Sequence, residues 1–445
     1  NKVLVISNTP TPFGSQFSGN SQIGITRFNP DGSADTSYGP LGQILLDAGP
    51  DFELEVVDAT LRRDGAVLVL GTLFGPFNQS DMAVWAVLPN GQLDAAFADG
   101  GLKRIRRGGS PSDRAGAIVP YILETDRFLV AGDLRDGTQG DHGLMQVVLF
   151  ANNGSLCAAA DCGNVVGGDV GLPTQWRMLR QDFNFDSDVT GLVAYTQTSP
   201  TFALRFRTLM KRSVVDAQGQ FDGVVIGTSF PSQGNIFGLD PGFGSGGFKQ
   251  YFFSAAAGFR HNNGNRLALQ TLGTNVRLVI AGFIANAQNL DPSMGVYAMN
   301  LLTGAADTSF NGGNARVFDY AANGIHGDAY ADDVLVTPDG KLLIGGGYEY
   351  AGFAFGDAAL ARLNADGSFD SSFGNLGAAL PGRMGYGHSL LGSDRDNRLA
   401  SMALSADGER VVFSGPGYTS NDGSHYARVM RARLHVSDLL RNGFE

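Results

Sequence analysis

Hydrophobic positions in this chain fall into short runs that follow a polar turn and end in glycine. The clearest run occupies residues 342–344, between Asp339-Gly340 and the paired glycines Gly345 and Gly346. Apolar runs of this length between turn residues are typical of buried β-strands, whereas sustained helical periodicity is hard to find in this sequence. Runs with the same outline lie at 3–6, 67–70, 128–131, 191–194, 278–281 and 411–413. The sequence therefore predicts about seven copies of one β-rich unit, each of about 64 residues.

A second repeated element follows the apolar runs. Residues 25–39 and 360–374 share the pattern Asn-x-Asp-Gly-Ser-x-Asp followed by an aromatic residue and glycine. Weaker copies lie at 89–97, 153–157 and 303–310, and another, at 219–244, is split by an insertion. Because Asp-Gly between apolar runs is a strong hairpin signal, each unit is predicted to hold four strands. In the clearest unit, strand a covers 333–336, strand b 342–344 and strand c 358–363, and the second element leads to strand d.

Four short strands repeated about seven times predict an all-β fold, a seven-bladed β-propeller of four-stranded blades in one domain. The expected blades cover 1–57, 58–114, 115–180, 181–265, 266–330, 331–398 and 399–445, and the last closes with the N-terminal strand. An open β-solenoid is the alternative architecture. Six or eight blades are also compatible, because residues 150–250 are irregular and could hide an inserted subdomain.

Composition and charge narrow the classes of function. With 43% hydrophobic and 17% charged residues, the chain is too apolar for a disordered protein and implies a large core. The net charge of −11 argues against nucleic acid, which requires a basic surface. The longest apolar runs are far shorter than the roughly 20 residues of a transmembrane helix. We therefore expect neither a nucleic-acid partner nor a membrane span.

Two cysteines, Cys157 and Cys162, lie close together in a glycine-flanked segment. A zinc site would need further Cys or His nearby in sequence, and there is none. In a secreted protein this pair predicts a small loop-closing disulfide, whereas in a cytosolic protein the two would be free thiols.

The two elements together resemble a known repeat. Pro-Asp-Gly-Lys-Leu-Leu-Ile-Gly-Gly followed by Ala-Leu-Ala-Arg-Leu-Asn-Ala-Asp-Gly-Ser-Phe-Asp-Ser-Ser-Phe-Gly is similar to the delta-60 repeat family of bacterial secreted proteins. The likeness is close at 333–377, good at 23–42, partial at 58–101 and 278–313, and poor at 115–250. It implies an extracellular or cell-envelope protein with a propeller-like array, and no particular activity. The final residues 440–445 also resemble the Gly-Phe-Glu tail of secreted proteins from Xanthomonas-like bacteria.

The repeated turn suggests two interpretations. Its closely spaced acidic residues around a glycine resemble a calcium loop, with Asp31, Asp35, Asp366 and Asp370 as candidate ligands. Alternatively, the Asx side chains cap the turn while the following aromatic residue fills the core. The copies at 89–97 and 303–310 keep the glycine, the last Asp and the aromatic residue but lose the first acidic position, which favours the structural interpretation. No cofactor is predicted, and calcium remains the alternative.

Five of the six histidines fall in connections that a four-stranded blade places on one face, the face of the b–c and d–a loops. Long polar loops collect such residues without any function, so a ligand site there is a hypothesis. Its candidate ligand-binding residues are His142, His261, His326, His388, His425, Tyr386 and Arg383. Signatures of catalytic nucleophiles or phosphate loops are missing.

Three functions are compatible with these features. The first is a secreted or cell-surface binding propeller whose partner is a protein, glycan or surface polymer. The second is a structural subunit of an extracellular assembly, which would self-associate. The third is a hydrolase or lyase with its site at the mouth of a central channel, where His326 and His388 would act as acid and base.

Overall fold

The computed structural model describes the chain as two compact units. It covers residues 2–8, 21–76, 79–106, 112–120, 127–135, 142–155, 164–165, 182–183, 187–197, 203–212, 223–231, 236–254, 259–286, 292–320, 328–349, 356–374, 376, 380–386, 394–396, 398–405, 408–419 and 425–433. The N-terminal unit comprises Lys2–Val214 and Val225–Lys249, and the C-terminal unit comprises Val215–Val224 and Gln250–Glu445. Each unit is described by itself.

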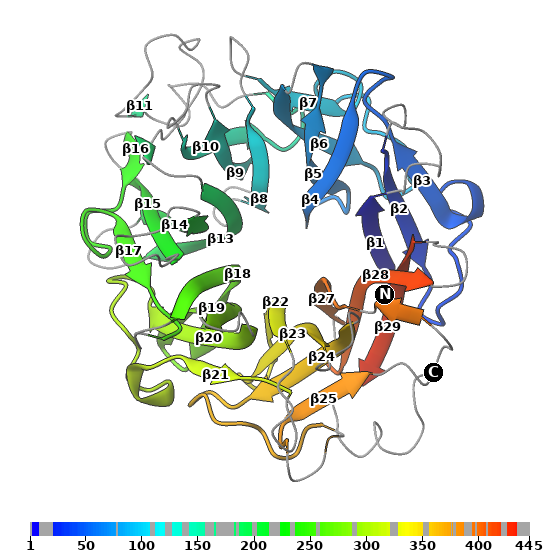
Figure 1. The fold of residues 1–445 in the computed structure, drawn as a ribbon. Helices are drawn as coiled ribbons and strands as arrows, with labels where there is room; N and C mark the ends of the chain where they lie inside the picture. Colours follow the sequence, from blue (N-terminus) through cyan, green and yellow to red (C-terminus); the bar gives the residue numbers. More distant parts are fainter. Residues whose placement is uncertain are drawn as a thin grey trace. The chain divides into compact units, whose positions relative to one another are not determined.

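The N-terminal unit holds four antiparallel sheets, the last with one parallel pair (Figure 1). The first sheet has the order β1 (Val3–Asn8), β2 (Ile23–Phe28), β3 (Gln43–Leu46). The second runs β4 (Glu53–Leu61), β5 (Val67–Phe74), β6 (Ser80–Val87), β7 (Leu102–Ile105). The third runs β8 (Arg114–Pro120), β9 (Arg127–Arg135), β10 (His142–Phe150), β12 (Asp182–Phe183). The fourth runs β13 (Ser187–Gln197), β14 (Ala203–Arg212), β15 (Gly223–Pro231), β16 (Ile236–Leu239), β11 (Asn164–Val165), and β17 (Phe248–Tyr251) also pairs with β15.

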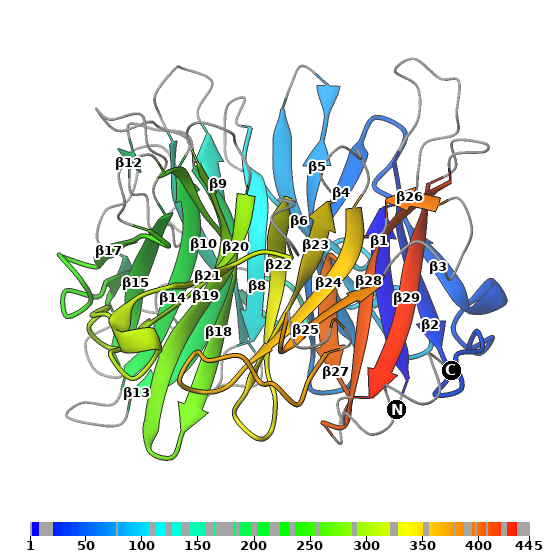
Figure 2. The same ribbon diagram turned by 60° about the horizontal axis from the view of Figure 1, so that its bottom comes forward.

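The C-terminal unit holds three sheets of four strands each. One runs β18 (Phe259–Leu272), β19 (Asn275–Asn286), β20 (Pro292–Asn300), β21 (Arg316–Phe318), and its long β18–β19 hairpin is visible in Figure 2. The next runs β22 (Ala329–Val336), β23 (Leu342–Glu349), β24 (Gly356–Leu363), β25 (Arg383–Tyr386). In the last sheet, β26 (Asp394–Asp396), β27 (Ser401–Leu404) and β29 (His425–Arg433) all pair with β28 (Arg410–Thr419). Two 3-10 turns lie at Pro40–Gly42 and Asn311–Gly313.

The prediction of an all-β propeller is confirmed, but seven blades of four strands are wrong. Six sheets of the described residues have four or more strands, and the first sheet has only three. In that sheet β1 carries the pattern of strand b, and among the described residues it pairs only with β2, without a strand a beside it. The number of blades was predicted by counting copies of strand b. A copy of strand b can occur in a sheet that lacks one of the other three strands. The predicted blade boundaries and the closure by the N-terminal strand stay predictions.

One predicted strand b is in the wrong place. The run 191–194 lies in β13, the first strand of the fourth sheet, which pairs only with β14 among the described residues. A β-bulge between Val189 and Gly191 marks this strand as a counterpart of strand a. The first strands of four other sheets have a bulge at the corresponding place. These bulges lie at Val56/Asp58, Ala115/Ala117, Gly264/Arg266 and Ala331/Asp333.

The predicted strands of the clearest unit are confirmed as β22, β23 and β24. Strands β5 and β23 are buried at every residue except the last, as expected of strands packed on both faces. Trp85 in β6 is fully buried. Strand β1 is only half-buried along most of its length, in agreement with its edge position.

Aspartates near the bulges join consecutive sheets. Asp58 accepts a hydrogen bond from the backbone N–H of Ile118 at 3.0 Å, and Asp333 accepts one from Met402 at 2.6 Å. Because a buried amide without a partner is costly, these side chains satisfy backbone groups that the sheets themselves leave unpaired. Among the described residues, we find no helix with the length and hydropathy needed to cross a bilayer.

Candidate functional site

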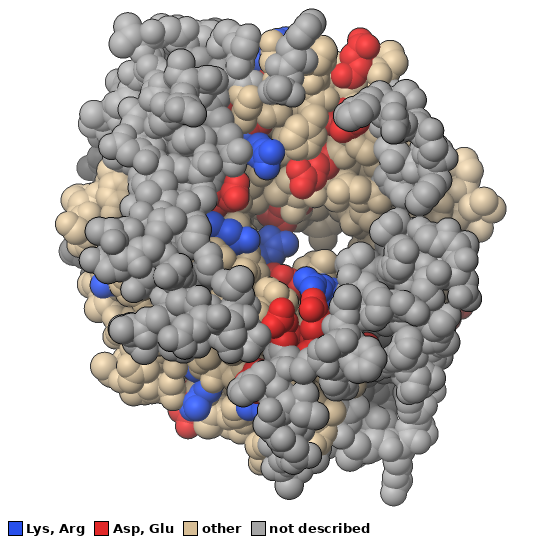
Figure 3. Space-filling view, viewed as in Figure 1, with Lys and Arg blue, Asp and Glu red and all other residues tan. Residues whose placement is uncertain are grey.

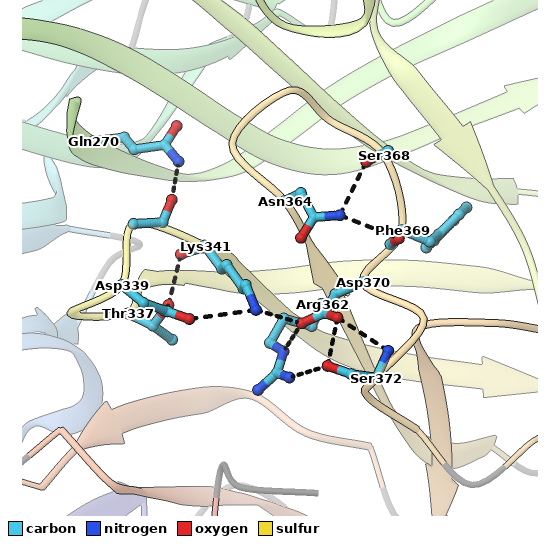
Figure 4. A network of polar contacts seen from close by, with 11 residues as sticks. Gln270, Thr337, Asp339, Lys341, Arg362, Asn364, Ser368, Phe369, Asp370 and Ser372 are labelled. Atoms are coloured by element: carbon cyan, nitrogen blue, oxygen red, sulfur yellow. Dashed lines mark hydrogen bonds and ion pairs between the residues drawn. The ribbon is translucent and has the colours of Figure 1, made fainter.

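The Asn-x-Asp-Gly-Ser-x-Asp turn after β24 is an ionic scaffold (Figure 4). Asp366 accepts hydrogen bonds from the backbone N–H of Ser368 at 2.9 Å and from its hydroxyl at 2.6 Å. Asp370 Oδ2 lies 2.7 Å from Arg362 Nε and 2.9 Å from Lys341 Nζ. The Arg362 guanidinium stands 4.7 Å from the ring centre of Phe373, which is buried. The turn therefore couples an Asx cap to a buried ion pair and an aromatic plug.

Other turns of the chain repeat this arrangement. Each pairs an arginine from a strand with the last Asp of the turn and places the guanidinium over the following aromatic ring. The ion-pair distances are 2.5 Å for Arg27–Asp35, 3.1 Å for Arg277–Asp307 and 2.9 Å for Arg207–Asp240. The matching rings are Tyr38, Phe310 and Phe243, with ring centres 4.3, 5.1 and 4.1 Å from the respective guanidinium carbons. The predicted aromatic plugs are thus confirmed.

The scaffold also connects one sheet to the next. Arg27 donates to the carbonyl of Pro89, Arg277 donates to the carbonyl of Ala365, and Arg62 donates to the carbonyl of Ala151 at 2.9 Å. Each accepting carbonyl belongs to the repeated turn of the following sheet. Each of these arginines therefore links two consecutive turns. The sequence of a single repeat does not reveal this link, because the donor and the acceptor belong to different repeats.

The turn glycines pack on the aromatic plug of the preceding sheet. A Cβ added to Gly367 would lie 2.9 Å from Phe310, and one added to Gly154 would lie 2.9 Å from Phe97. Both glycines also have positive φ, +82° and +64°. These turns therefore require glycine for two reasons: the backbone has a positive φ, and an aromatic ring of the preceding sheet lies where a Cβ would be.

This geometry supports the turn-capping interpretation over the calcium alternative. Asp35 already accepts from Arg27 and Lys2, and Asp370 accepts from Arg362 and Lys341. The remaining candidates, Asp31 and Asp366, each cap a serine two residues ahead. No group of three or more His, Cys, Asp or Glu suited to a metal ion occurs in the part of the chain that the structure describes.

The turn carboxylates predict loss of stability in acid. Hydrogen bonds from Lys2 and Ser37 hold the pKa of Asp35 below its usual value, and those from Ser368 do the same for the pKa of Asp366. Burial would raise the pKa of Asp370, but hydrogen bonds from Ser372 and Lys341 bring it below the usual value. A carboxyl group with a lowered folded-state pKa contributes stability above its unfolded pKa of about 4 and loses it as the pH falls toward the folded value. Urea unfolding should therefore show a free energy of unfolding that falls below about pH 4; a free energy that stays constant on acidification would contradict this.

The candidate ligand residues are only partly described. His326, His388, Cys157 and Cys162 lie outside the described residues. His142 and His425 are the first residues of β10 and β29. His261 lies within β18, paired with Ala285, and not in a loop as expected. Arg383 and Tyr386 begin and end β25 rather than lying in a loop. The structure does not test whether these residues meet at one site.

Charged and aromatic side chains gather where β22 begins and β23 ends, which we call the loop-side end of this sheet. Acidic and basic atoms lie together over these two strands in Figure 3. Glu349, the last residue of β23, forms an ion pair with Arg398. The Tyr330 hydroxyl donates to Asp328 Oδ2 at 3.2 Å, and the backbone N–H of Glu349 donates to the carbonyl of Asp328 at 2.7 Å.

Aromatic side chains also pack at the loop-side end of β22 and β23. The Arg398 guanidinium stands 4.9 Å from the ring centre of Tyr330, and the ring of Phe283 meets that of Tyr330 edge-on at 5.0 Å. Burial, followed by the negative charges of Asp328 and Glu349, raises the pKa of Tyr330 to about 12. Tyr330 therefore keeps its proton at neutral pH and acts as a hydrogen-bond donor.

The neighbouring bulges add further charges. Asn265, at the bulge of β18, donates to the carbonyl of Ala331 at 2.7 Å and to Asp332 at 3.4 Å. Arg266 lies 3.8 Å from Asp333. We call Asp328, Asp332, Asp333, Glu349, Arg266 and Arg398 the loop-side cluster; its four carboxylates and two guanidinium groups give a net charge of −2.

Sequence analysis did not single out Tyr330, Glu349 or Arg398. A signal was present in the glycines at the end of strand b. A Cβ at Gly347 would lie 2.7 Å from Arg398 Cγ, so only glycine leaves room for that arginine. The partner of this glycine lies far along the chain, so the sequence pattern alone did not show it.

Two segments of the chain match the model of a propeller repeat family. Residues 13–38 and 337–373 match the family "Domain of unknown function (DUF5122) beta-propeller". The match covers the two best copies of the repeated turn and less than half of the chain. No curated protein matches the chain.

Several solved structures are similar at low identity. One is a protein of unknown function from Dyadobacter fermentans DSM 18053, with 12% identity and a TM-score of 0.42, covering 97% of this chain and 91% of that one. Another is the α-L-arabinofuranosidase Arb93A from Fusarium graminearum, with 10% identity and a TM-score of 0.43, covering 88% and 96%. A third is Drosophila Semaphorin 2a, with 10% identity and a TM-score of 0.39, covering 86% and 69%. These likenesses carry no statement about activity or ligands.

Proposed function

We propose that this chain is a binding propeller that recognises positively charged groups of a partner at the loop-side end of β22 and β23. The observation that carries the proposal is the loop-side cluster, which combines a net charge of −2 with the rings of Tyr330 and Phe283. Carboxylates beside aromatic rings are suited to cationic side chains, through ion pairs and through attraction to the ring face. The chain as a whole is also acidic, with a net charge of −11, which attracts a basic partner over a longer range.

The contrast with the repeated turns supports this assignment. In the turns, Asp35 and Asp370 are almost fully buried and each is held by two cationic side chains. In the loop-side cluster, the side chains of Glu349 and Arg398 keep 22% and 36% of their surface exposed. A partner can therefore reach charges of the cluster, whereas the turn charges are committed to the fold.

A secreted or cell-surface location completes the proposal. It rests on the similarity of residues 337–373 to a propeller repeat family and on their resemblance to the delta-60 repeat of bacterial secreted proteins. A protein partner with exposed lysine or arginine is the ligand class that the net charge of the cluster favours over a neutral glycan.

We expect the full chain to bind a lysine–glycine peptide more tightly than a glutamate–glycine peptide of the same length. Glu349→Gln should weaken binding of the lysine peptide by up to about fivefold, because it removes one partly exposed charge. Surface plasmon resonance at several salt concentrations measures this, and added salt should weaken binding further. Asp51→Asn, an exposed carboxylate outside the cluster, is the matched control and should bind like the wild type. Equal binding of both peptides, or an unchanged affinity in Glu349→Gln, would refute the proposal.

A further inference from the structure

A second polar site lies between two sheets of the C-terminal unit, away from the loop-side cluster. Tyr320 follows β21, the edge strand of its sheet, and Arg383 begins β25, the edge strand of the next sheet. The Tyr320 side chain is 6% exposed, and its ring stacks on Tyr348 with ring centres 4.9 Å apart. The Arg383 guanidinium stands 4.3 Å from the ring centre of Phe369 and 5.5 Å from that of Phe318. Aromatic rings from both sheets thus surround the two polar groups.

Both polar groups have donors without an acceptor. The Tyr320 hydroxyl and Arg383 Nε are buried atoms with no hydrogen-bond partner among the described residues. Both lie beside Phe318: Tyr320 is two residues further along the chain, and the Arg383 guanidinium stands 5.5 Å from the ring centre of Phe318. Burial raises the pKa of the Tyr320 hydroxyl above its usual value, and the charge of Arg383 opposes that rise. A buried donor that lacks an acceptor costs free energy, so such an arrangement points to an acceptor that the described residues do not supply.

The local charge favours a negatively charged acceptor. Arg316 also approaches the ring of Phe369, at 5.9 Å, so two guanidinium groups flank that ring. The negative charge of Asp319 interacts with Arg383. Since Arg316 and Arg383 carry two positive charges against this one negative charge, the three residues together are positively charged. Burial lowers the pKa of Arg383, so its charged form is destabilised by lost hydration and an anion would restore that stabilisation.

A second tyrosine–arginine pair differs from this one at its arginine. Tyr38 is also buried, its hydroxyl also lacks a partner, and the Arg27 guanidinium stands 4.3 Å from its ring. Arg27, however, donates to Asp35, Ser37 and the carbonyl of Pro89. Arg383 differs because its Nε has no acceptor among the described residues, and the Tyr320 hydroxyl has none either.

We propose that Arg383 and Tyr320 form a subsite for a carboxylate group of a ligand. The guanidinium donates from Nε to one carboxylate oxygen and the Tyr320 hydroxyl donates to the carboxylate as well. A planar carboxylate suits a guanidinium whose faces are covered by rings, because the two planes align edge to edge. The subsite uses none of the residues of the proposed cationic site, so each can fail without the other.

Acetate is the probe, with acetamide as its uncharged counterpart of the same shape. Thermal unfolding of the full chain, at constant ionic strength, should show a melting temperature that rises saturably with acetate and not with acetamide. Arg383→Gln and Tyr320→Phe should each weaken the apparent acetate affinity by about tenfold or more, because each removes a hydrogen bond to a charged group. Tyr38→Phe is the matched control, since it removes a similar unpaired hydroxyl elsewhere and should keep the acetate response.

Tyr320→Phe also reports on folding. Without acetate it should be at least as stable as the wild type, because it removes a buried hydroxyl that has no partner. A loss of the acetate response in a variant that is fully folded would support the subsite. An equal response to acetamide, a response to inorganic phosphate alone, or an acetate response that survives in Tyr320→Phe would each overturn it. A high-resolution structure grown in acetate with only a water molecule between the two side chains would overturn it as well.

Discussion

Asp370→Asn is expected to destabilise the fold by about 3 kcal/mol or more, because it leaves a buried guanidinium without its counter-charge. The side chains of Arg362 and Asp370 are only 8% and 7% exposed, and Lys341 reaches the same carboxylate at 2.9 Å. Asparagine keeps the shape of the side chain but removes the charge, so the cost reports the unpaired cations rather than a cavity. Urea unfolding at neutral pH measures it as a lower midpoint with an unchanged slope.

Asp366→Asn is the matched control in the same turn. Its carboxylate is exposed and accepts only from Ser368, and an asparagine oxygen can accept the same hydrogen bonds. We expect its effect to stay within about 0.5 kcal/mol, as for most surface substitutions. Equal effects of the two substitutions would show that the buried ion pair is not what stabilises the turn.

Gly367→Ala should destabilise the chain by about 2 to 5 kcal/mol, from two separate causes. The first is the positive φ of +82°, which costs an alanine about 1–2 kcal/mol. The second is the contact with Phe310, where the new Cβ would lie at 2.9 Å and force the ring or the turn to move, at about 1–3 kcal/mol. The midpoint of urea unfolding checks the sum.

Gly32→Ala separates the two causes. Gly32 occupies the equivalent turn position with a φ of +87°, but a Cβ there would meet nothing within 4 Å. It should therefore show only the backbone cost of about 1–2 kcal/mol. If both substitutions cost the same, the contact between the turn and the ring of the preceding sheet contributes nothing to stability.

The sequence predicted the local units well because their signals are local. Asp339-Gly340 between two apolar runs predicted the β22–β23 hairpin, and Gly340 has the positive φ, +78°, that this turn requires. The aromatic plugs followed from the same reasoning, since Phe310 and Phe373 are buried as expected. The wrong assignments arose where two strands look alike: the run around Gly191 is apolar enough for strand b, and only its pairing with β14 identifies it as an edge strand.

For the candidate site, the sequence predicted only the face of the b–c and d–a loops and not the residues that meet there. Asp328 directly precedes β22, whereas its neighbours Glu349 and Arg398 come from a strand end and from the start of the next sheet. The spacing of such residues along the chain varies with loop length, so no short pattern connects them. The histidines drew attention because they are rare, although rarity says nothing about where their side chains point.

By itself, the sequence determined that this protein is a repeat of short strands and tight turns, since hydrophobic period and turn chemistry act over a few residues. It also determined which turn residues cap and which residue enters the core. The tertiary structure decided how many sheets are complete, which arginine reaches across to the next turn, and which charges stay exposed. These depend on contacts between residues that are dozens of positions apart, such as Arg277 with Ala365 and Glu349 with Arg398. Such contacts form only when the sheets pack together, so they cannot be predicted from the sequence of a single repeat.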